Sequence, residues 1–452
     1  EKLTNLNVVP LVATEFNINR IQKSYKEHIG SEISDVFGDD QKEQLKKQDV
    51  KEQTKGTKNI TQDTGTTKAV SIILEYAAKS GVSDVHIEPQ ENFTKVRYRV
   101  DGKLNEKISN IPKSNHESIV ARIKILARLK LDEKRQPQDG RFKINSNGER
   151  IDLRVSTLPT VHGEKVVIRL LRELGDNLTF EDLGLRGKGL EVFKEALTNA
   201  TGMILVTGPT GSGKTVTNAT SLRTLNKSDV NIITLEDPVE IRIPGVNQVQ
   251  VNTQAGLTFA SGLRSFLRQD PDIILVGEIR DSETANLAIQ ASLTGHLVLA
   301  TLHTNSAAGA IPRLIDMGVE DFLIASTLDV ALAQRLVRKL CTTCKEKFDP
   351  SPEMLKSFKR VLKEKMPTEF TIFKAVGCNK CGKSGYKGRI GIYEVLGINE
   401  DIQELISKKT NTFDIADAGI KNGMVTLVQD GYLRVLEGIT SLQEVMTATD
   451  ES

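Results

Sequence analysis

The feature that most constrains this chain is a glycine-rich octapeptide, GPTGSGKT, at residues 208–215. It follows a short apolar run, MILVT, and precedes TVTNATSLRTLN, a stretch that favours a helix. Strand, G-x-x-x-x-G-K-[ST] loop and helix in this order predict a phosphate-binding loop, or P-loop, and a chance glycine-rich turn would not supply all three. Such a loop is the mark of a nucleoside triphosphatase.

Each residue type in this loop has a physical task. The glycines allow the backbone to curl so that successive N–H groups face the phosphates. We expect Lys214 to reach the β- and γ-phosphates and Thr215 to offer its hydroxyl to Mg²⁺. The residues assigned to ATP binding are Gly208, Pro209, Thr210, Gly211, Ser212, Gly213, Lys214 and Thr215.

Four short apolar runs predict an α/β fold around this loop. They are MILVTG, NIITLED, DIILVGE and HLVLATLHT, and helical stretches alternate with them from residue 186 onward. Continuous apolar runs are typical of strands buried on both faces of a parallel sheet. Ligands of open α/β sheets bind at the carboxyl ends of the strands, so the polar residues after these runs should share one edge.

Two of these runs end in carboxylates. Glu278 comes directly after DIILVG. The run NIITL is followed by Glu236, Asp237 and Glu240. One acid is needed to support Mg²⁺ and another to orient or deprotonate water. The alternative is that these acids only cap helices.

The sequence divides into segments of different composition. Residues 1–30 resemble the remnant of an upstream N-terminal domain, and residues 31–67, rich in Gln, Lys, Asp, Thr and Gly, a flexible linker. Residues 68–172 predict a smaller α+β domain with hairpins at Asp101-Gly102 and Asn147-Gly148. Residues 173–185 form an acidic bridge, and residues 186–452 form the ATPase domain.

Composition narrows the function classes. The net charge of +2 and the 4% aromatic content argue against a nucleic-acid-binding protein. The longest uncharged run, residues 284–312, carries many Thr, Ser, Asn and Gln residues and suits a buried core better than a membrane span. We therefore expect a cytoplasmic protein. The chain begins at Glu1 without Met, so an upstream segment is expected to be missing.

The motifs together resemble the secretion ATPases of type II secretion and type IV pilus systems, from about residue 70 to the end. SDVHIEP (83–89) and VRYRVDGKL (96–104) are similar to the family's second N-terminal domain. GPTGSGKT is similar to its Walker A loop, EDPVE (236–240) to its Asp box, DPDIILVGEIRD (270–281) to its Walker B motif and GHLVLATLHTN (295–305) to its His box. The similarity favours the pilus assembly ATPases within this family.

The resemblance implies a RecA-like core in a hexameric ring, with each nucleotide between the two domains. It implies that Glu240 is the general base, that Glu278 is the Walker B carboxylate supporting Mg²⁺, and that His296 and His303 face the nucleotide. A histidine in an apolar run is often a satisfied core residue, and that alternative stays open for both.

Further cations should balance the charge of the phosphates, and arginines of the small domain are the candidates. Arg141 and Arg154 match positions where the family carries arginine fingers, which in the best cases contribute about 10³–10⁵ in rate. Surface salt bridging is the alternative for either residue.

Four cysteines complete the set of candidate residues. They form two C-x-x-C pairs, Cys341 with Cys344 and Cys378 with Cys381, and the chain has no other cysteine. Two such pairs predict a tetrahedral Cys₄ zinc site in a subdomain at about 341–381, structural because four protein ligands leave no open position. A redox pair or disulfides are the alternatives, and no thioredoxin-like setting supports them.

These features predict a hexameric motor ATPase that drives type IV pilus assembly through an inner-membrane platform protein and, indirectly, the pilins. It would be peripheral to the cytoplasmic membrane and bind no nucleic acid directly. The alternatives are a type II secretion pseudopilus ATPase, a pilus retraction ATPase, which usually lacks the four cysteines, a nucleic-acid translocase and a non-enzymatic ring.

Overall fold

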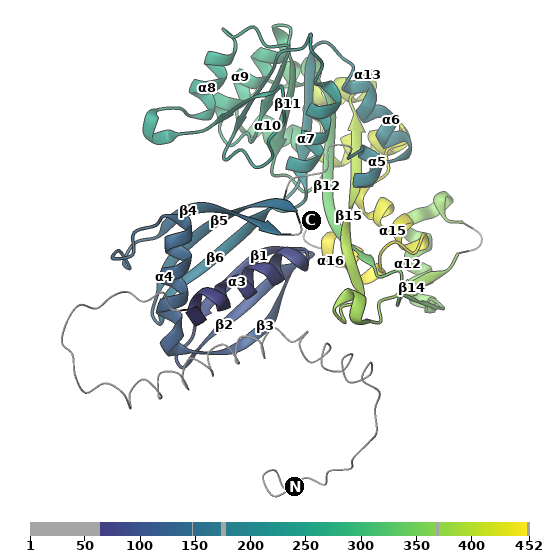
Figure 1. Cartoon of the computed structure of the whole chain (residues 1–452). Coiled ribbons are helices and arrows are strands. Elements are labelled where there is room, and N and C mark those ends of the chain that lie inside the picture. Colours follow the sequence, from purple (N-terminus) through teal and green to yellow (C-terminus); the bar gives the residue numbers. More distant parts are fainter. Residues whose placement is uncertain (1–63, 147, 173–177, 368–369, 450–452) are drawn as a thin grey trace, which may run out of the picture. The chain divides into compact units, whose positions relative to one another are not determined.

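The computed structural model describes residues 64–146, 148–172, 178–367 and 370–449. The chain divides into an N-terminal unit, Glu1–Glu173, and a C-terminal unit, Leu174–Ser452 (Figure 1). The expectations for residues 1–30 and most of the predicted linker lie outside the described residues. No helix in the described part of the chain is long and apolar enough to cross a membrane.

The N-terminal unit is an antiparallel sheet with two helices on one face (Figure 1). The strand order is β3-β2-β1-β6-β5-β4. The elements are α3 (Thr64–Lys79), β1 (Val82–Pro89), β2 (Phe93–Val100), β3 (Lys103–Pro112), α4 (His116–Ala127), β4 (Gln138–Ser146), β5 (Glu149–Thr160) and β6 (Gly163–Leu171), with a 3₁₀ turn at Lys113–Asn115.

Local sequence explains these elements. The predicted hairpin at Asp101-Gly102 is confirmed: Val100 pairs with Lys103, and both turn residues have positive φ, as a tight two-residue turn requires. Alternate residues of the strands, such as Leu153 and Val155, are buried against α3 and α4. The other face of the sheet carries charged residues.

The C-terminal unit is built on a seven-stranded sheet of order β15-β12-β7-β11-β10-β8-β9. Its strands are β7 (Gly202–Thr207), β8 (Ile232–Glu236), β9 (Asn247–Gln250), β10 (Ile273–Val276), β11 (Leu297–Leu302), β12 (Leu328–Leu340) and β15 (Tyr386–Gly397). All neighbours pair in parallel except β12 with β15. The predicted RecA-like core is confirmed, with β11 between the P-loop strand β7 and the Walker B strand β10.

The four predicted core strands are buried along their whole length, as continuous apolar runs require. Helices cover the sheet, and a hydrophobic core lies on each face. The helices are α5 (Phe180–Leu183), α6 (Gly187–Ala196), α7 (Lys214–Leu225), α8 (Phe259–Phe266), α9 (Ser282–Leu293), α10 (Ala310–Asp316), α11 (Asp321–Thr327), α12 (Pro352–Leu362), α13 (Glu400–Ser407), α14 (Thr412–Lys421), α15 (Leu427–Leu436) and α16 (Leu442–Thr449).

An insertion between β12 and β15 forms a small subdomain. It contains α12, a two-stranded sheet of β13 (Glu346–Phe348) and β14 (Ile372–Lys374), and 3₁₀ turns at Lys363–Lys365 and Asn379–Cys381. A further 3₁₀ turn of the C-terminal unit, Thr253–Ala255, lies outside the insertion, between β9 and α8. Phe358 of α12 is fully buried and packs its ring edge-on against Tyr432 of α15, with 5.0 Å between the centroids. This contact joins the insertion to the ATPase core.

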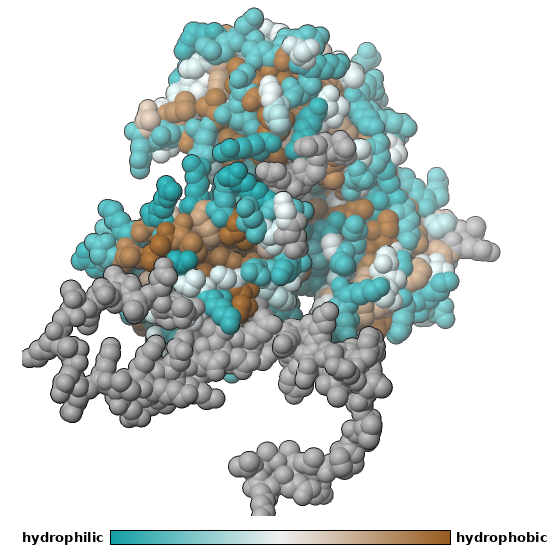
Figure 2. All heavy atoms as spheres, in the orientation of Figure 1, coloured by the Kyte–Doolittle hydropathy of each residue, from teal (hydrophilic) through white to brown (hydrophobic). Residues whose placement is uncertain are grey.

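Side chains on the drawn face are mostly hydrophilic, as Figure 2 shows, and hydrophobic residues gather around α4 and β6 of the N-terminal unit. Ile125 of α4 is 52% exposed, and Leu131, just after this helix, is 47% exposed.

Candidate nucleotide site and cysteine cluster

The P-loop lies between β7 and α7, and its glycines are required by its shape. Gly208, Gly211 and Gly213 all have positive φ, a backbone region that side chains disfavour. A Cβ at Gly208 would lie 2.6 Å from the carbonyl oxygen of Gln334, and one at Gly213 would lie 2.7 Å from Nε2 of the same residue. The loop therefore curls tightly against β12.

Lys214, the first residue of α7, folds back over this loop. Its Nζ donates hydrogen bonds to the carbonyl oxygens of Gly208, at 2.7 Å, and Pro209, at 3.2 Å. Burial lowers the pKa of Lys214, with Arg335 acting in the same direction and Glu278 opposing it. A cation held by neutral carbonyls in a partly buried site is well suited to bind a polyphosphate.

Several buried polar atoms near the loop lack a partner. They are Oγ of Ser212, Oγ1 of Thr207 and Oδ1 of Asn218. Unpartnered buried polar atoms are costly, and in native proteins they mark a place where a ligand or water completes the bonding. Thr215, the expected Mg²⁺ ligand, is half-buried in the first turn of α7.

Backbone contacts hold the ends of four parallel strands together beside the P-loop. Gly208 N–H donates to the carbonyl of Leu302, and Ile279 N–H donates to that of Thr301. Gly277 N–H donates to the carbonyl of Leu235, and the Thr301 hydroxyl donates to that of Gly277 at 2.6 Å. The residues that follow β7, β8, β10 and β11 therefore share one edge of the sheet.

Glu278 is the centre of the charges at this edge. Its carboxylate accepts a hydrogen bond from Nη2 of Arg280 at 2.6 Å and lies 3.3 Å from Nε2 of His303. Burial opposes its ionisation, but Arg280, His303 and Lys214 outweigh burial and lower the pKa of Glu278. For His303, burial and Lys214 lower the pKa, and Glu278 acts against them. The structure brings Lys214, Glu278 and His303 together.

The end of β8 and the segment after it add further acids. Glu236 is buried and accepts hydrogen bonds from the Thr234 hydroxyl at 2.7 Å and Nε2 of Gln248 at 3.0 Å. Burial raises the pKa of Glu236, and the charge of Glu240 raises it further, so these carboxylates are near each other. Glu240 is half-buried and follows the strand end, as expected for a side chain that faces bound substrate.

The structure does not bring His296 to this edge. His296 precedes β11, and its carbonyl accepts from N–H of Gly202 at the start of β7, whereas the P-loop follows the end of β7. Its Nδ1 lies 2.8 Å from the carbonyl oxygen of Ala291. Because β7 and β11 are parallel, His296 lies at the opposite edge of the sheet from His303.

Arg141 and Arg154 lie in the N-terminal unit, directly opposite each other on β4 and β5. Arg154 is also opposite Arg169 of β6, which is opposite Asp84 of β1. These residues form a row across the face of the sheet that carries no helix. Asp84 accepts a hydrogen bond from Nε of Arg169 at 2.9 Å.

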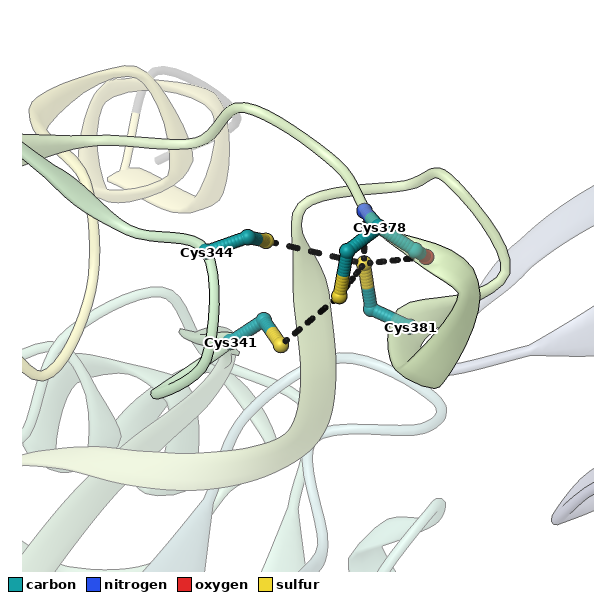
Figure 3. Close-up of side chains that lie close together, drawn as sticks. All are labelled: Cys341, Cys344, Cys378 and Cys381. Atoms are coloured by element: carbon teal, nitrogen blue, oxygen red, sulfur yellow. Dashed lines mark hydrogen bonds between the residues drawn. The ribbon is translucent and has the colours of Figure 1, made fainter.

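The four cysteines converge at the base of the insertion (Figure 3). Their sulfur atoms all lie within 4.8 Å of one another, and the pairs Cys341–Cys378, Cys344–Cys381 and Cys378–Cys381 are 3.9, 3.8 and 3.8 Å apart. Zinc–sulfur bonds of about 2.3 Å in a tetrahedron place sulfur atoms about 3.8 Å apart. The cluster therefore has the dimensions of a Cys₄ zinc site and is too open for a disulfide, whose sulfurs lie about 2 Å apart.

Thiolate chemistry also suits a cation here. Backbone N–H groups of Cys378 and Gly385 point at Sγ of Cys381, at 3.1 and 3.2 Å. Burial raises the pKa of Cys381, but these hydrogen bonds have the larger effect and lower it to about 6. Burial and the neighbouring thiols raise the pKa of Cys344 to about 12, a conflict that a divalent cation would remove.

The cluster closes the far end of the β12–β15 ladder. Cys341 directly follows β12, and the second pair precedes β15, whose Tyr386 pairs with Leu340. The same β12 carries Gln334 against the P-loop, where its Oε1 accepts from the Thr217 hydroxyl at 2.8 Å. One strand thus contacts both the candidate nucleotide site and the candidate metal site.

Motif matching misses three residues that shape the site. Gln334 and Arg335 are buried in β12, and Arg335 donates to the carbonyl and Oδ1 of Asn305, in the loop after His303. Arg280 donates a hydrogen bond to the carboxylate of Glu278. Polar residues inside a long apolar strand are the only clue for the first two.

The profile of the family described as "Type II/IV secretion system protein" matches residues 59–447. The chain is 45% identical to a type IV pilus assembly ATPase PilB of Thermus thermophilus over 99% of its own length and 49% of the relative's. It is 47% identical to the type II secretion system ATPase E of Vibrio cholerae over 85% of its own length and 75% of the relative's. It therefore spans about half of the first relative and three quarters of the second.

Among solved structures, the pilus retraction motor PilT with bound ADP matches with a TM-score of 0.56 and 27% identity. The match covers 83% of this chain and 95% of that one.

Proposed function

Because the chain belongs to the type II/IV secretion system protein family, we propose that it is a motor ATPase that drives type IV pilus assembly. The observation that carries the ATPase proposal is the convergence of Lys214, Glu278 and His303 beside the P-loop, at the carboxyl edge of the parallel sheet. Two neighbouring carboxylates lie at the same edge: Glu236 ends β8, and Glu240 follows it.

We assign the P-loop, residues 208–215, to the phosphates of ATP. Lys214 would exchange its two carbonyl partners for β- and γ-phosphate oxygens, and the unpartnered Ser212 hydroxyl would gain a partner. Thr215 and Glu278 would hold Mg²⁺, which neutralises phosphate charge when it is bound.

Glu240 is our candidate for the general base. Hydrolysis requires that a water molecule attack the γ-phosphorus, that the bond to the β-phosphate oxygen break, and that the proton of the water be accepted. Glu240 would accept this proton. His303, held by Glu278, would contact the γ-phosphate from the end of β11, and we assign His296 no contact with the nucleotide of its own chain.

Arg141 and Arg154 are the candidate arginine fingers. They would bring positive charge from the N-terminal domain to the ATPase domain. In our domain assignment these domains span residues 68–172 and 186–452, and residues 173–185 link them. Their positions support this proposal, because Arg141 and Arg154 lie directly opposite each other on neighbouring strands and could contact one anion together.

The cysteine cluster would hold a structural zinc ion with Cys341, Cys344, Cys378 and Cys381 as ligands. The spacing of the sulfur atoms supports this assignment. Zinc would fix residues 341–381 to the end of β12 and would take no part in hydrolysis.

The wider assembly is proposed from the pilus and secretion functions of the relatives. We propose a cytoplasmic homohexamer, peripheral at the inner face of the cytoplasmic membrane, that acts on an inner-membrane platform protein and through it on pilins. A type II secretion ATPase is the second candidate, since the Vibrio cholerae relative is as similar as the pilus relative.

Deletion of the gene in the source organism separates these two candidates. The proposal predicts loss of surface filaments with normal protein secretion, restored by the wild-type gene and not by Lys214→Ala. Loss of secretion with intact filaments would contradict pilus assembly and favour the secretion ATPase.

A further inference from the structure

A groove beside the cysteine cluster has no role in the proposed ATPase. Its volume is about 490 Å³. It lies between the end of β12, the CTTC segment, the CNKC turn and the segment after α15. The lining residues are Lys339, Leu340, Cys341, Thr342, Thr343, Lys345, Lys380, Lys387, Glu437, Gly438 and Ile439.

The lysines of this groove come from four separate segments. Lys339 is the penultimate residue of β12, Lys345 follows CTTC, Lys380 lies in CNKC and Lys387 is the second residue of β15. None of these four forms an ion pair with any described residue. Two other basic residues in and beside the insertion do have acidic partners: Lys374 pairs with Glu346, and Arg338 pairs with Glu444.

The one acid in the groove is already engaged. Glu437 pairs with Arg186 and lies 3.9 Å from Arg434, both outside the groove. Lys345 is held in place, since its Nζ donates to the carbonyl of Gly438 at 2.7 Å and lies 4.4 Å from the ring centroid of Phe373. The groove therefore keeps an excess of positive charge, and one of its four lysines is fixed in place.

The sequence around the groove also has an excess of positive charge. Residues 339–389 contain 13 Lys and Arg against 5 Asp and Glu, a formal charge of +8, whereas the whole chain carries +2. The remaining residues are therefore acidic on balance, at −6. Such concentration of one sign on one subdomain attracts an oppositely charged partner and speeds its encounter.

We propose that this groove binds an acidic segment, rich in Asp and Glu, of a partner protein. A concave site reached by lysines from several segments fits an extended chain with carboxylates along it. The two exposed threonines of CTTC add hydroxyl donors, and the half-buried Ile439 adds an apolar contact.

A membrane surface fits these observations less well. Lipid binding by a soluble domain combines basic residues with exposed apolar side chains that enter the bilayer interface. Of the described residues in 339–389, only Val376 is a large hydrophobic residue with such exposure, at 49%, and it does not line the groove. A single phosphate would fill only a small part of the volume.

The proposal goes beyond the proposed ATPase, and its test needs no ATP turnover. The full chain, with its metal, is titrated into a fluorescently labelled hexaglutamate peptide, and binding is followed by anisotropy. The test variant is Lys339→Gln with Lys380→Gln and Lys387→Gln. The control variant is Lys347→Gln with Lys356→Gln and Lys359→Gln, which removes three exposed lysines of the same subdomain outside the groove.

We expect the groove variant to weaken peptide binding about ten-fold, since each exposed charge pair contributes a factor of a few, and the control variant to change it less than about two-fold. Both variants should keep the zinc content and melting temperature of the wild type. Equal weakening by both variants would overturn the proposal, as would no measurable binding of the peptide by the wild type. Groove-dependent binding of anionic phospholipid vesicles without the peptide, or displacement of the peptide by micromolar pyrophosphate, would overturn it in favour of a lipid or a small anion.

Discussion

Glu278→Gln removes the charge at the centre of the candidate site and preserves the side-chain shape. In the wild type this carboxylate accepts a 2.6 Å hydrogen bond from Arg280 and lies 3.3 Å from Nε2 of His303. Glutamine can still accept from Arg280 through its amide oxygen. The substitution therefore separates the electrostatic role of Glu278 from its packing.

The expected cost to folding is small. Two unit charges 4 Å apart attract by about 1 kcal/mol in water, and the side chains of Arg280 and His303 are 60% and 42% exposed. The variant should lose less than about 1 kcal/mol of folding free energy. Because Glu278 raises the pKa of His303, that pKa should fall further in the variant.

The expected cost to catalysis is much larger. A charge that supports the metal and the transition state in a site of this kind typically contributes about 10²–10³ in rate. Turnover should fall by at least this factor, whereas ATP binding should weaken by less than about ten-fold, because Lys214 and the loop N–H groups remain.

The assay is steady-state phosphate release with ATP binding measured in parallel by calorimetry. Glu191→Gln is the matched control, because Glu191 is an exposed acid of α6 without an ion pair among the described residues. Turnover within about three-fold of the wild type in Glu278→Gln would refute the role assigned to Glu278. Equal losses in Glu191→Gln would show that the effect comes from charge in general.

Three further substitutions or measurements test separate parts of the account. Arg154→Ala should leave ATP binding largely intact and abolish turnover, measured as above, and unchanged turnover would remove Arg154 from the site. Elemental analysis should find about one zinc per chain, and Cys344→Ser should lower both zinc content and melting temperature; a metal-free chain with unchanged melting would contradict the zinc site. Burial raises the pKa of Glu236, so the wild type loses stability as pH rises through that folded-state pKa. Glu236→Gln does not show this loss, because glutamine does not titrate. As pH rises from the ordinary glutamate pKa through the raised pKa of Glu236, the melting temperature of Glu236→Gln should rise relative to the wild type. A constant difference would mean that Glu236 does not titrate in this way.

The core strands could be predicted because burial on both faces leaves a simple pattern. MILVT, NIITL and DIILV are continuous apolar runs, and each forms a strand buried along its length. The rule that ligands bind at the carboxyl ends of parallel strands then places Lys214 and Glu278 at one edge from sequence order alone. The cysteines are equally informative, because two C-x-x-C pairs are typical of a zinc site and of few other structures.

The placement of His296 could not be predicted from its motif. The two histidines share one sequence box, but a whole strand, β11, separates them, so that they lie at opposite edges of the sheet. Residues that are close together in a sequence motif can lie at opposite ends of the strand that joins them.

The contacts behind the P-loop are beyond sequence patterns for another reason. Gln334 is 2% exposed in the middle of β12, and its contact with Gly213 joins segments more than a hundred residues apart. Periodicity describes which face of a strand is buried, but it does not identify the neighbour that a buried amide meets. Only the pairing of β12 with β7 reveals it.

The most direct test of the central claim is phosphate release from ATP by the purified chain, compared with Lys214→Ala. The account predicts Mg²⁺-dependent release by the wild-type chain and none above background by the variant, although both fold. Absence of hydrolysis by the wild type in its oligomeric form, or equal hydrolysis by Lys214→Ala, would contradict the claim that this P-loop powers a motor.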